Sequence, residues 1–366
     1  MVTVLTRTIG PSGRDYASFT LAEADVTNIG TSADLVANDE AIVFEADAGT
    51  YSESVTFSSA LTTDATRNVT YKPAAGSEHR GVFGAGVNLS QVGTTPQIVN
   101  DHYLILDGIQ ITDNQFSVLP TWTGQNVVCR NLLVLLGETS SSWGLTLYTC
   151  GSTSDPLVVE NCVFKIVDAV CGVYVRAFPS NSSMRVTNST FHGNAANTSL
   201  RWYAASVVSQ NSTSVSLDVI NCLDLTGGQT YSDTTGSPPI VTGSNNFGGA
   251  TSPFPVAIQG SPYPITATTD TDPGAGDWAI YQASNGQLYN IVANDVWQQG
   301  VGPTANSDVP ATDILGYARY GATANPGAFE LGLPVPGIRV KPRHFQVNTA
   351  ATAHAVSVWQ PQLRKL

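Results

Sequence analysis

The sequence predicts an all-β fold, a right-handed parallel β-helix or solenoid, with an N-terminal capping helix and an extended C-terminal arm. Three observations predict it. Charged residues make up 12% of the 366 residues, about half of the roughly 25% found in ordinary soluble domains. The 33 glycines and 20 prolines favour short strands joined by turns over helices. The third observation, an internal repeat, predicts how the strands are arranged.

Each repeat combines a short alternating strand, an Asn or Asp, a small or apolar residue and a second short strand. Five segments show it: "YLILDGIQITDN", "NVVCRNLLVLLGE", "LVVENCVFKIVDA", "SMRVTNSTFHGNA" and "SLDVINCLDLTGG". The Asn or Asp of each repeat is its anchor, and the five anchors are Asp107, Asn131, Asn161, Asn188 and Asn221. Successive anchors lie 24, 30, 27 and 33 residues apart, and a sixth is expected at Asn245 or Asn246. This period, without a helical pattern inside it, fits one solenoid coil per repeat. A propeller blade would need roughly 40 to 50 residues.

The anchors are predicted to form a structural ladder at the bend between two strands of each coil. Such a bend needs a residue that tolerates the left-handed backbone region, and after Gly this is best met by Asn or Asp. Coils stack about 4.8 Å apart, so anchor side chains can hydrogen-bond to each other along the stack. Cys162 and Cys222 directly follow an anchor and should share one interior column. The five cysteines form no CxxC pair, which favours buried free thiols over zinc or disulfides.

The N-terminal segment, residues 1–40, is predicted to contain one helix, in "GRDYASFTLAEADVTNI", with Thr20 as its cap. Its apolar positions are Tyr16, Phe19, Leu21, Ala24 and Val26. A helix there would cover the open end of the first coil, where strand edges and core are otherwise exposed. The coils are predicted to fill residues 41–330, beginning with two strands around a Gly turn.

Charge is distributed unevenly along the chain. The formal net charge is -12, and residues 1–330 carry 28 acidic and 11 basic side chains, about -17. The C-terminal arm, residues 331–366, contains no acid and five bases: Arg339, Lys341, Arg343, Arg364 and Lys365. These bases form either a solubilising end or an assembly arm that docks against an acidic neighbour, another copy of the chain included.

The acidic body argues against a nucleic-acid partner. No apolar stretch approaches a membrane span, and no secretion signal opens the sequence, so we expect no membrane partner and synthesis in a cytoplasm.

Both ends of the coil region resemble a known group of proteins. "GRDYASF" followed by "AIVFEADAGTYSESVTF" resembles the opening of right-handed parallel β-helix proteins of the pectin-lyase-like superfamily. "DILGYARYGATANPGAFE" is similar to their closing segment, whose D-I-x-G-x-x-R and G-A-F-E pattern falls on Asp313, Ile314, Gly316, Arg319 and residues 327–330. The resemblance covers about residues 6–330. It implies the fold but not the chemistry, because enzymes and non-enzymes share the closing motif. Arg319 is expected to pair with Asp313 or Glu330 and tie the last coil shut.

One group of acids is a catalytic candidate. Glu138 and Asp168 lie seven residues after their anchors, and Asp113 lies six after Asp107. If the register holds, the three form a column on adjacent coils. Two carboxylates about 5–5.5 Å apart suit the active site of a retaining glycosidase. The same column of acids would equally suit a calcium ion. The third interpretation is that the acids are solvated turn residues. His192, on the next coil, is expected at the surface. We expect no cofactor, and the W-I-D-H motif typical of pectate lyases is absent.

Aromatic residues provide a second candidate site. Sugar rings stack on exposed aromatic side chains. A glycan-binding groove would use Trp122, Trp143, Tyr174 and Trp202. Core packing and contacts between subunits are the alternative interpretations. No P-loop, nucleophile elbow, G-x-G-x-x-G after a strand or H-E-x-x-H is present.

Three functional hypotheses follow. The favoured one is a non-enzymatic structural protein of a bacteriophage virion, a β-helical spike, fibre or capsid-decoration subunit. It would form a homotrimer, contact other virion proteins and face host surface polysaccharide. Flat lateral faces that pack around an axis and the absent secretion signal favour it, together with analogy at the level of the fold. The alternatives are a polysaccharide-depolymerising tailspike, a hydrolase or lyase acting through Glu138 and Asp168, and a non-catalytic glycan-binding adhesin.

Overall fold

The structure is a computed structural model, and contacts divide the chain into two units, Met1–Gly332 and Leu333–Leu366. The predicted arm, residues 331–366 with its five bases, lies outside the described residues. The structure describes residues 1–58, 60–79, 81, 83–90, 97–98, 103–113, 116–118, 127–136, 143–147, 156–166, 171–177, 182–193, 203–210, 215–225, 231–235, 240–244, 246–248, 280–282, 288–290, 300–314, 316, 318–319, 321–324 and 327–328.

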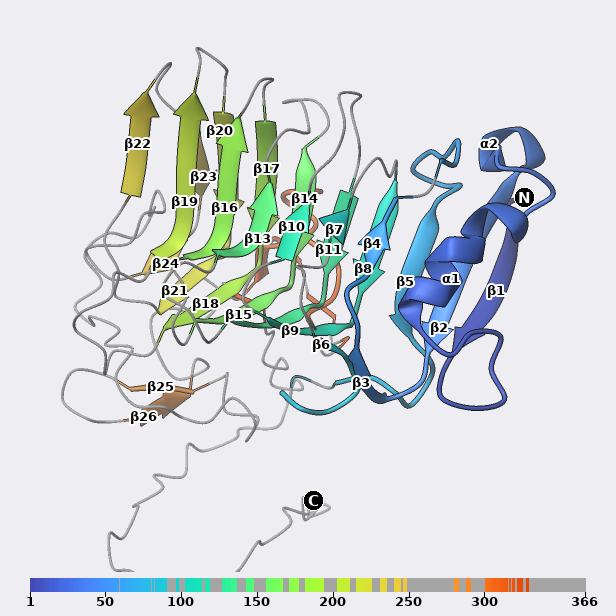
Figure 1. The fold of residues 1–366 in the computed structure, drawn as a ribbon. Coiled ribbons are helices and arrows are strands. Elements are labelled where there is room, and N and C mark those ends of the chain that lie inside the picture. Colours follow the sequence, from blue (N-terminus) through green and yellow to red (C-terminus); the bar gives the residue numbers. More distant parts are fainter. Residues whose placement is uncertain are drawn as a thin grey trace, which may run out of the picture. The chain divides into compact units, whose positions relative to one another are not determined.

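Three long parallel sheets dominate the first unit, so the prediction of an all-β chain with parallel strands is confirmed (Figure 1). The first sheet contains β1 (Thr3–Ile9), β2 (Glu40–Ala46), β5 (Val69–Pro73), β8 (Leu104–Asp107), β11 (Val127–Arg130), β14 (Leu157–Glu160), β17 (Ser182–Thr187), β20 (Val215–Ile220) and β23 (Ile240–Ser244). The second contains β3 (Gly49–Ser52), β6 (Val87–Ser90), β9 (Gln110–Asp113), β12 (Leu133–Leu136), β15 (Val163–Ile166), β18 (Thr190–Gly193), β21 (Leu223–Leu225) and β24 (Phe247–Gly248). The third contains β4 (Thr56–Phe57), β7 (Gln97–Ile98), β10 (Phe116–Val118), β13 (Trp143–Leu147), β16 (Cys171–Ala177), β19 (Tyr203–Gln210) and β22 (Tyr231–Thr235).

The chain visits the three sheets in rotation, β2 to β3 to β4 and then β5 to β6 to β7, and every pairing within them is parallel. Each round contributes one strand to each sheet, an order consistent with a parallel β-solenoid. The described residues also include two short antiparallel pairs, β25 (Ile280–Gln282) with β26 (Leu288–Asn290) and β27 (Gly300–Val301) with β28 (Thr323–Ala324). Among the described residues, no helix is long and apolar enough to cross a membrane.

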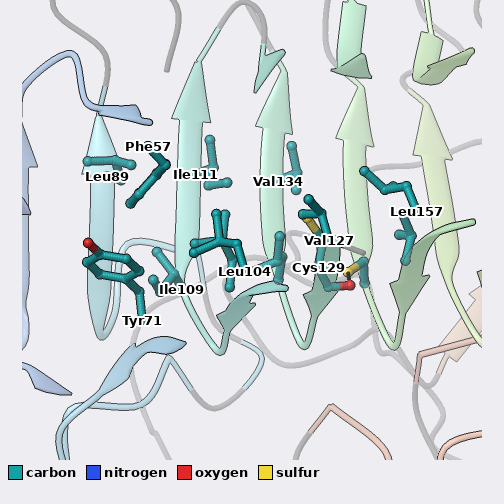
Figure 2. Close-up of a cluster of buried hydrophobic side chains, with 14 of the residues drawn as sticks. Phe57, Tyr71, Leu89, Leu104, Ile109, Ile111, Val127, Cys129, Val134 and Leu157 are labelled. Carbon is teal, nitrogen blue, oxygen red and sulfur yellow. Dashed lines mark hydrogen bonds between the residues drawn. The ribbon is translucent and has the colours of Figure 1, made fainter. Parts of the chain in front are cut away.

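The alternation of side chains along each strand builds the core between the sheets. In β8, β11 and β14 every second residue is buried, and the register places Val127 on Leu104 and Cys129 on Leu106. Figure 2 shows Leu104, Val127, Cys129 and Leu157 following one another from strand to strand, with Ile111 and Val134 joining them from the second sheet. Burying one such side chain stabilises a fold by about 1.5–3 kcal/mol, so repeated stacking drives assembly of the coils.

The N-terminal helix is shorter than the stretch from Tyr16 to Val26 over which the sequence predicted it. α1 (Phe19–Asp25) is capped by Ser18, whose hydroxyl accepts a hydrogen bond from the Leu21 amide. The Thr20 hydroxyl, the expected cap, donates to Glu53 at 2.6 Å instead. Leu21 is 54% exposed, since the helix packs through Phe19 and Ala22. Two further single turns follow, η1 (Val26–Asn28) and α2 (Leu35–Asn38).

An aromatic cluster joins α1 to the first coils. Phe19 contacts Tyr51 edge-to-face at 5.1 Å, and Phe44 stacks on Tyr71 at 4.6 Å between ring centroids. The Tyr71 hydroxyl donates to the Glu23 carboxylate of α1 at 2.6 Å. The first sheet starts before the helix, because β1 pairs with β2 along its whole length. Residues 1–40 therefore contain the first strand of the sheet as well as the helix.

Candidate functional site at the polar corner

The polar corner is the row of bends where the chain leaves the first sheet for the second. Four Asn residues occupy these bends with left-handed backbones: Asn131, Asn161, Asn188 and Asn221, with φ of 55°, 54°, 46° and 54°. In the preceding coil Gly108 takes this place, at φ 68°. Asp107 pairs with Arg130 and therefore lies one residue before the bend.

Hydrogen bonds run along this ladder of side chains. The Asn131 Nδ2 donates to Asp107 Oδ1 at 2.7 Å, so Asp107 joins the ladder from its displaced position. The Asn161 Nδ2 donates to Asn131 Oδ1 at 3.3 Å, and the Asn221 Nδ2 donates to Asn188 Oδ1 at 3.4 Å. The backbone amides of Asn131, Asn161 and Asn188 each donate to the end of the first-sheet strand in the following coil, at 2.9–3.1 Å. These residues hold equivalent places in successive coils.

The residues after the bends form an interior column. The register of β12, β15, β18 and β21 aligns Leu132, Cys162, Ser189 and Cys222, all buried. Asn246 follows in this column, where its Oδ1 accepts from the Cys222 amide at 2.8 Å. Asn245, the other candidate anchor, lies outside the described residues. Burial raises the pKa of Cys162 well above its usual value and that of Cys129 to about 12, so these thiols are protonated and act as apolar side chains.

An insertion loop, residues 74–86, covers the corner from one side. It stands between β5 and β6, where later coils use only two residues. Its His79 is 2% exposed, with Nε2 at 2.7 Å from the Asn131 carbonyl oxygen and Nδ1 accepting from the Gly81 amide at 2.9 Å. The Gly84 amide donates to the Gln110 side chain at 2.7 Å. The loop thus reaches over the next two bends.

A closing segment, residues 300–328, covers the corner from the other side. The Thr312 carbonyl accepts from Asn161 Nδ2 at 2.6 Å, and the Arg319 guanidinium donates to Asn161 Oδ1 at 3.1 Å. Further along, the Gly327 amide donates to the Asn221 carbonyl at 2.6 Å. Arg319 therefore binds the middle of the stack, whereas the sequence suggested a role at the last coil.

Charged and hydroxyl groups extend this contact over neighbouring strands. Asp308 forms a 2.7 Å salt bridge with Arg185 of β17. The Ala328 amide donates to the Thr190 hydroxyl of β18 at 3.0 Å, and Arg319 also donates to the Gly327 carbonyl at 3.0 Å. The closing segment fastens coils that lie more than a hundred residues away in sequence.

An outer hydrophobic cluster joins the two covers. Leu133 and Val163 point away from the interior yet are fully buried, and they pack with Ile314 and Ala328 of the closing segment. Phe83 of the insertion loop packs against the same cluster. β12 and β15 are thus buried on both faces where they begin, which explains why apolar residues stand next to each other there (Leu133 with Val134, Val163 with Phe164) in place of alternation.

Three charged groups lie beside the corner on adjacent strands. Arg130 forms a 2.9 Å salt bridge with Asp107, and the register places Glu160 on its other side. Burial raises the pKa of Glu160, a shift that Arg130 opposes and Asp107 reinforces. Burial also lowers the pKa of His79. Among the described residues no three His, Cys, Asp or Glu side chains gather as metal ligands do.

The predicted catalytic acids are only partly placed. Glu138 and Asp168 lie outside the described residues. Asp113 ends β9 and pairs with Leu136. Counted from the bends, Asp113 comes five residues after Gly108, whereas Glu138 and Asp168 each come seven after their bends. His192 lies in β18 and pairs with Lys165.

The predicted aromatic groove is also only partly placed. Trp122 and Trp202 lie outside the described residues. Trp143 lies in β13 and Tyr174 in β16, where only their backbones are described. Trp143 pairs with Cys171, three residues before Tyr174. The two aromatics therefore do not hold the same place in their coils.

The covered corner was not anticipated from the sequence, although two signals pointed to it. The insertion loop coincides with the Gly-rich run "AAGSEHRGVFGAG", and the outer cluster coincides with the unbroken apolar run "LLVLL". No protein-family model, curated protein or solved structure matches the chain. The geometry of the corner indicates a structural role, the holding together of neighbouring coils. Two segments distant in sequence clamp the same row of bends and bury a second apolar cluster outside the coils.

Proposed function

We propose that the chain is a right-handed parallel β-helix of the pectin-lyase-like type and a non-enzymatic structural subunit of a bacteriophage virion, as a spike, fibre or capsid decoration. The observation that carries this is the clamped corner, with His79 on Asn131 and Arg319 on Asn161. Each coil of a solenoid touches only its neighbours and can fray alone. Clamps over several coils suit a part that must keep its shape outside a cell.

Further features fit this proposal. The right-handed path is the general preference for parallel strands joined by crossovers. α1, which shares an aromatic cluster with the first coils, serves as the end cap. The basic arm docks on an acidic neighbouring copy, and three copies pack through their lateral faces. Other virion proteins and host surface polysaccharide are the remaining contacts.

The native mass and the location of the protein test the proposal. We expect a trimer by light scattering at micromolar concentration, and labelling of phage particles by an antibody against the chain in electron microscopy. A variant lacking residues 331–366 should lose the trimer but keep its circular dichroism spectrum. A stable monomer that labels no particle would contradict the proposal.

A depolymerising enzyme is the second candidate, and the register of β12 and β15 favours it. Leu136 pairs with Ile166, two residues before Glu138 and Asp168, respectively. The wild type and Glu138→Gln should be compared for reducing-end release from a panel of bacterial polysaccharides, with Asp113→Asn as the matched control. Release that only Glu138→Gln abolishes would replace the structural proposal. No release by the wild type would remove the enzyme.

A further inference from the structure

We propose that His79 makes the polar corner a proton-responsive clasp, in which protonation of the imidazole frees the insertion loop from Asn131 and uncovers the outer hydrophobic cluster. The device is separate from the proposed virion role. It would act in any setting in which the protein meets acid.

The geometry admits only one protonation state. The Gly81 amide donates to Nδ1, so Nδ1 must carry a lone pair. The Asn131 carbonyl oxygen lies 2.7 Å from Nε2, so Nε2 must carry the proton. A second proton would fall on Nδ1, where it would face the Gly81 N–H and break that hydrogen bond. The 2% exposed ring offers the new charge almost no water.

The loop around His79 folds closely on itself. Gly81, Gly84 and Gly86 all have left-handed backbones, with φ of 78°, 85° and 74°. A Cβ at Gly86 would lie 2.5 Å from the His79 backbone nitrogen. Phe83, two residues beyond Gly81, packs on the outer cluster. Lifting the ring off Asn131 therefore lifts the side chain that covers the cluster.

Among the described residues, the charged groups that face His79 are Asp107 of β8 and Glu78 of its own loop, and both favour the imidazolium. Arg130 neutralises part of the Asp107 charge through their salt bridge. Burial outweighs both acids and lowers the pKa of His79 below the ordinary value of 6.5. The clasped state therefore loses stability relative to the open state as the pH falls below about 6.5. Glu160, beside Arg130, works in the opposite sense because burial raises its pKa.

Hydrogen exchange of the full chain tests the clasp. Protection factors, corrected for the pH dependence of intrinsic exchange, are compared at pH 7.5 and 5.0 for peptides covering residues 74–86 and 311–328. We expect both segments of the wild type to lose protection by roughly threefold or more at pH 5.0, as local opening does. Peptides from the interior strands β14 and β17 should change little.

Two variants assign the effect to His79. In His79→Gln the amide can still donate to Asn131 but does not titrate, so protection of both segments should be equal at the two pH values. His192→Gln, the matched histidine control, should respond like the wild type. Wild-type protection that is independent of pH, or a response that persists in His79→Gln, would overturn the proposal. If His79→Gln fails to fold, His79→Phe, which does not titrate either, replaces it, and wild-type protection that is independent of pH still overturns the proposal.

Discussion

The interior of the coils and the segments that cover the polar corner are built on opposite principles. The interior repeats one local arrangement, so that Phe164 stacks on Phe191 of the next coil with ring centroids 4.8 Å apart. The cover over the corner is assembled once, from partners up to 158 residues apart, as in the hydrogen bond from Arg319 to Asn161. The difference teaches that repeated contacts between neighbouring coils specify how the coils stack. Contacts between residues far apart in sequence add a second link, through which the unfolding of one coil depends on the coils beside it.

Truncating the interior should have the largest effect. Phe164→Ala removes a fully buried ring and should lower the free energy of unfolding by about 3–5 kcal/mol. Val163→Ala, the adjacent side chain in the outer cluster, should cost about 2 kcal/mol. Urea unfolding followed by tryptophan fluorescence measures both. Equal losses would mean that the two regions carry the same weight.

Removing the main polar clamp comes next. Arg319 is 4% exposed and donates to two oxygens. Arg319→Met should lower the free energy of unfolding by about 2–3 kcal/mol. Arg14→Met, which removes a salt bridge at the exposed surface, should leave it nearly unchanged. An undisturbed Arg319→Met variant would show that the closing segment is not fastened through this residue.

Two substitutions of Asn161 separate the contribution of its side-chain hydrogen bonds from that of its left-handed backbone. Asn161→Gly loses the hydrogen bonds but accepts the φ of 54°. Asn161→Ala loses the same bonds and adds left-handed strain, which should destabilise it by about 1 kcal/mol relative to Asn161→Gly. Thermal unfolding of both variants checks the difference. Identical stabilities would mean that the bend relaxes once Asn is gone.

The smallest effect concerns Glu160, whose pKa burial raises above the ordinary value of 4.5. A raised carboxyl pKa contributes stability below pH 4.5 and loses it as the pH rises through the folded-state value. Glu160→Gln should therefore gain stability relative to the wild type between pH 4 and pH 7.5. Urea unfolding at both pH values measures this, and a relative stability independent of pH would contradict it.

The features that recur in every coil could be predicted from the sequence. Asn131, Asn161, Asn188 and Asn221 were found because the left-handed bend restricts the residue type, and the interior place of Cys162 followed from them. The same restriction misled at Asp107, since adjacent Asp and Gly both tolerate the bend, and Gly108 occupies it.

Contacts made once leave no periodic signal. The outer partners of Leu133 and Val163 come from segments with no repeat to align, so the closing segment could not be placed over the middle coils. The helix cap was misassigned because Ser18 and Thr20 are both good capping residues, and the carboxylate of Glu53 engages Thr20 from 33 positions away. The Glu138 and Asp168 pair stays a prediction.

The place of the closing segment also bears on how the protein is made. A ribosome releases the strands that contain Leu133 and Val163 well before residues 300–328. Until then Leu133 and Val163 lack their partners Ile314 and Ala328 and have only Phe83 beside them, and exposed apolar surface of this kind promotes aggregation. The cluster is completed only when Ile314 and Ala328 of the closing segment have been synthesised, so the covering of this surface is a late event in the synthesis of the chain.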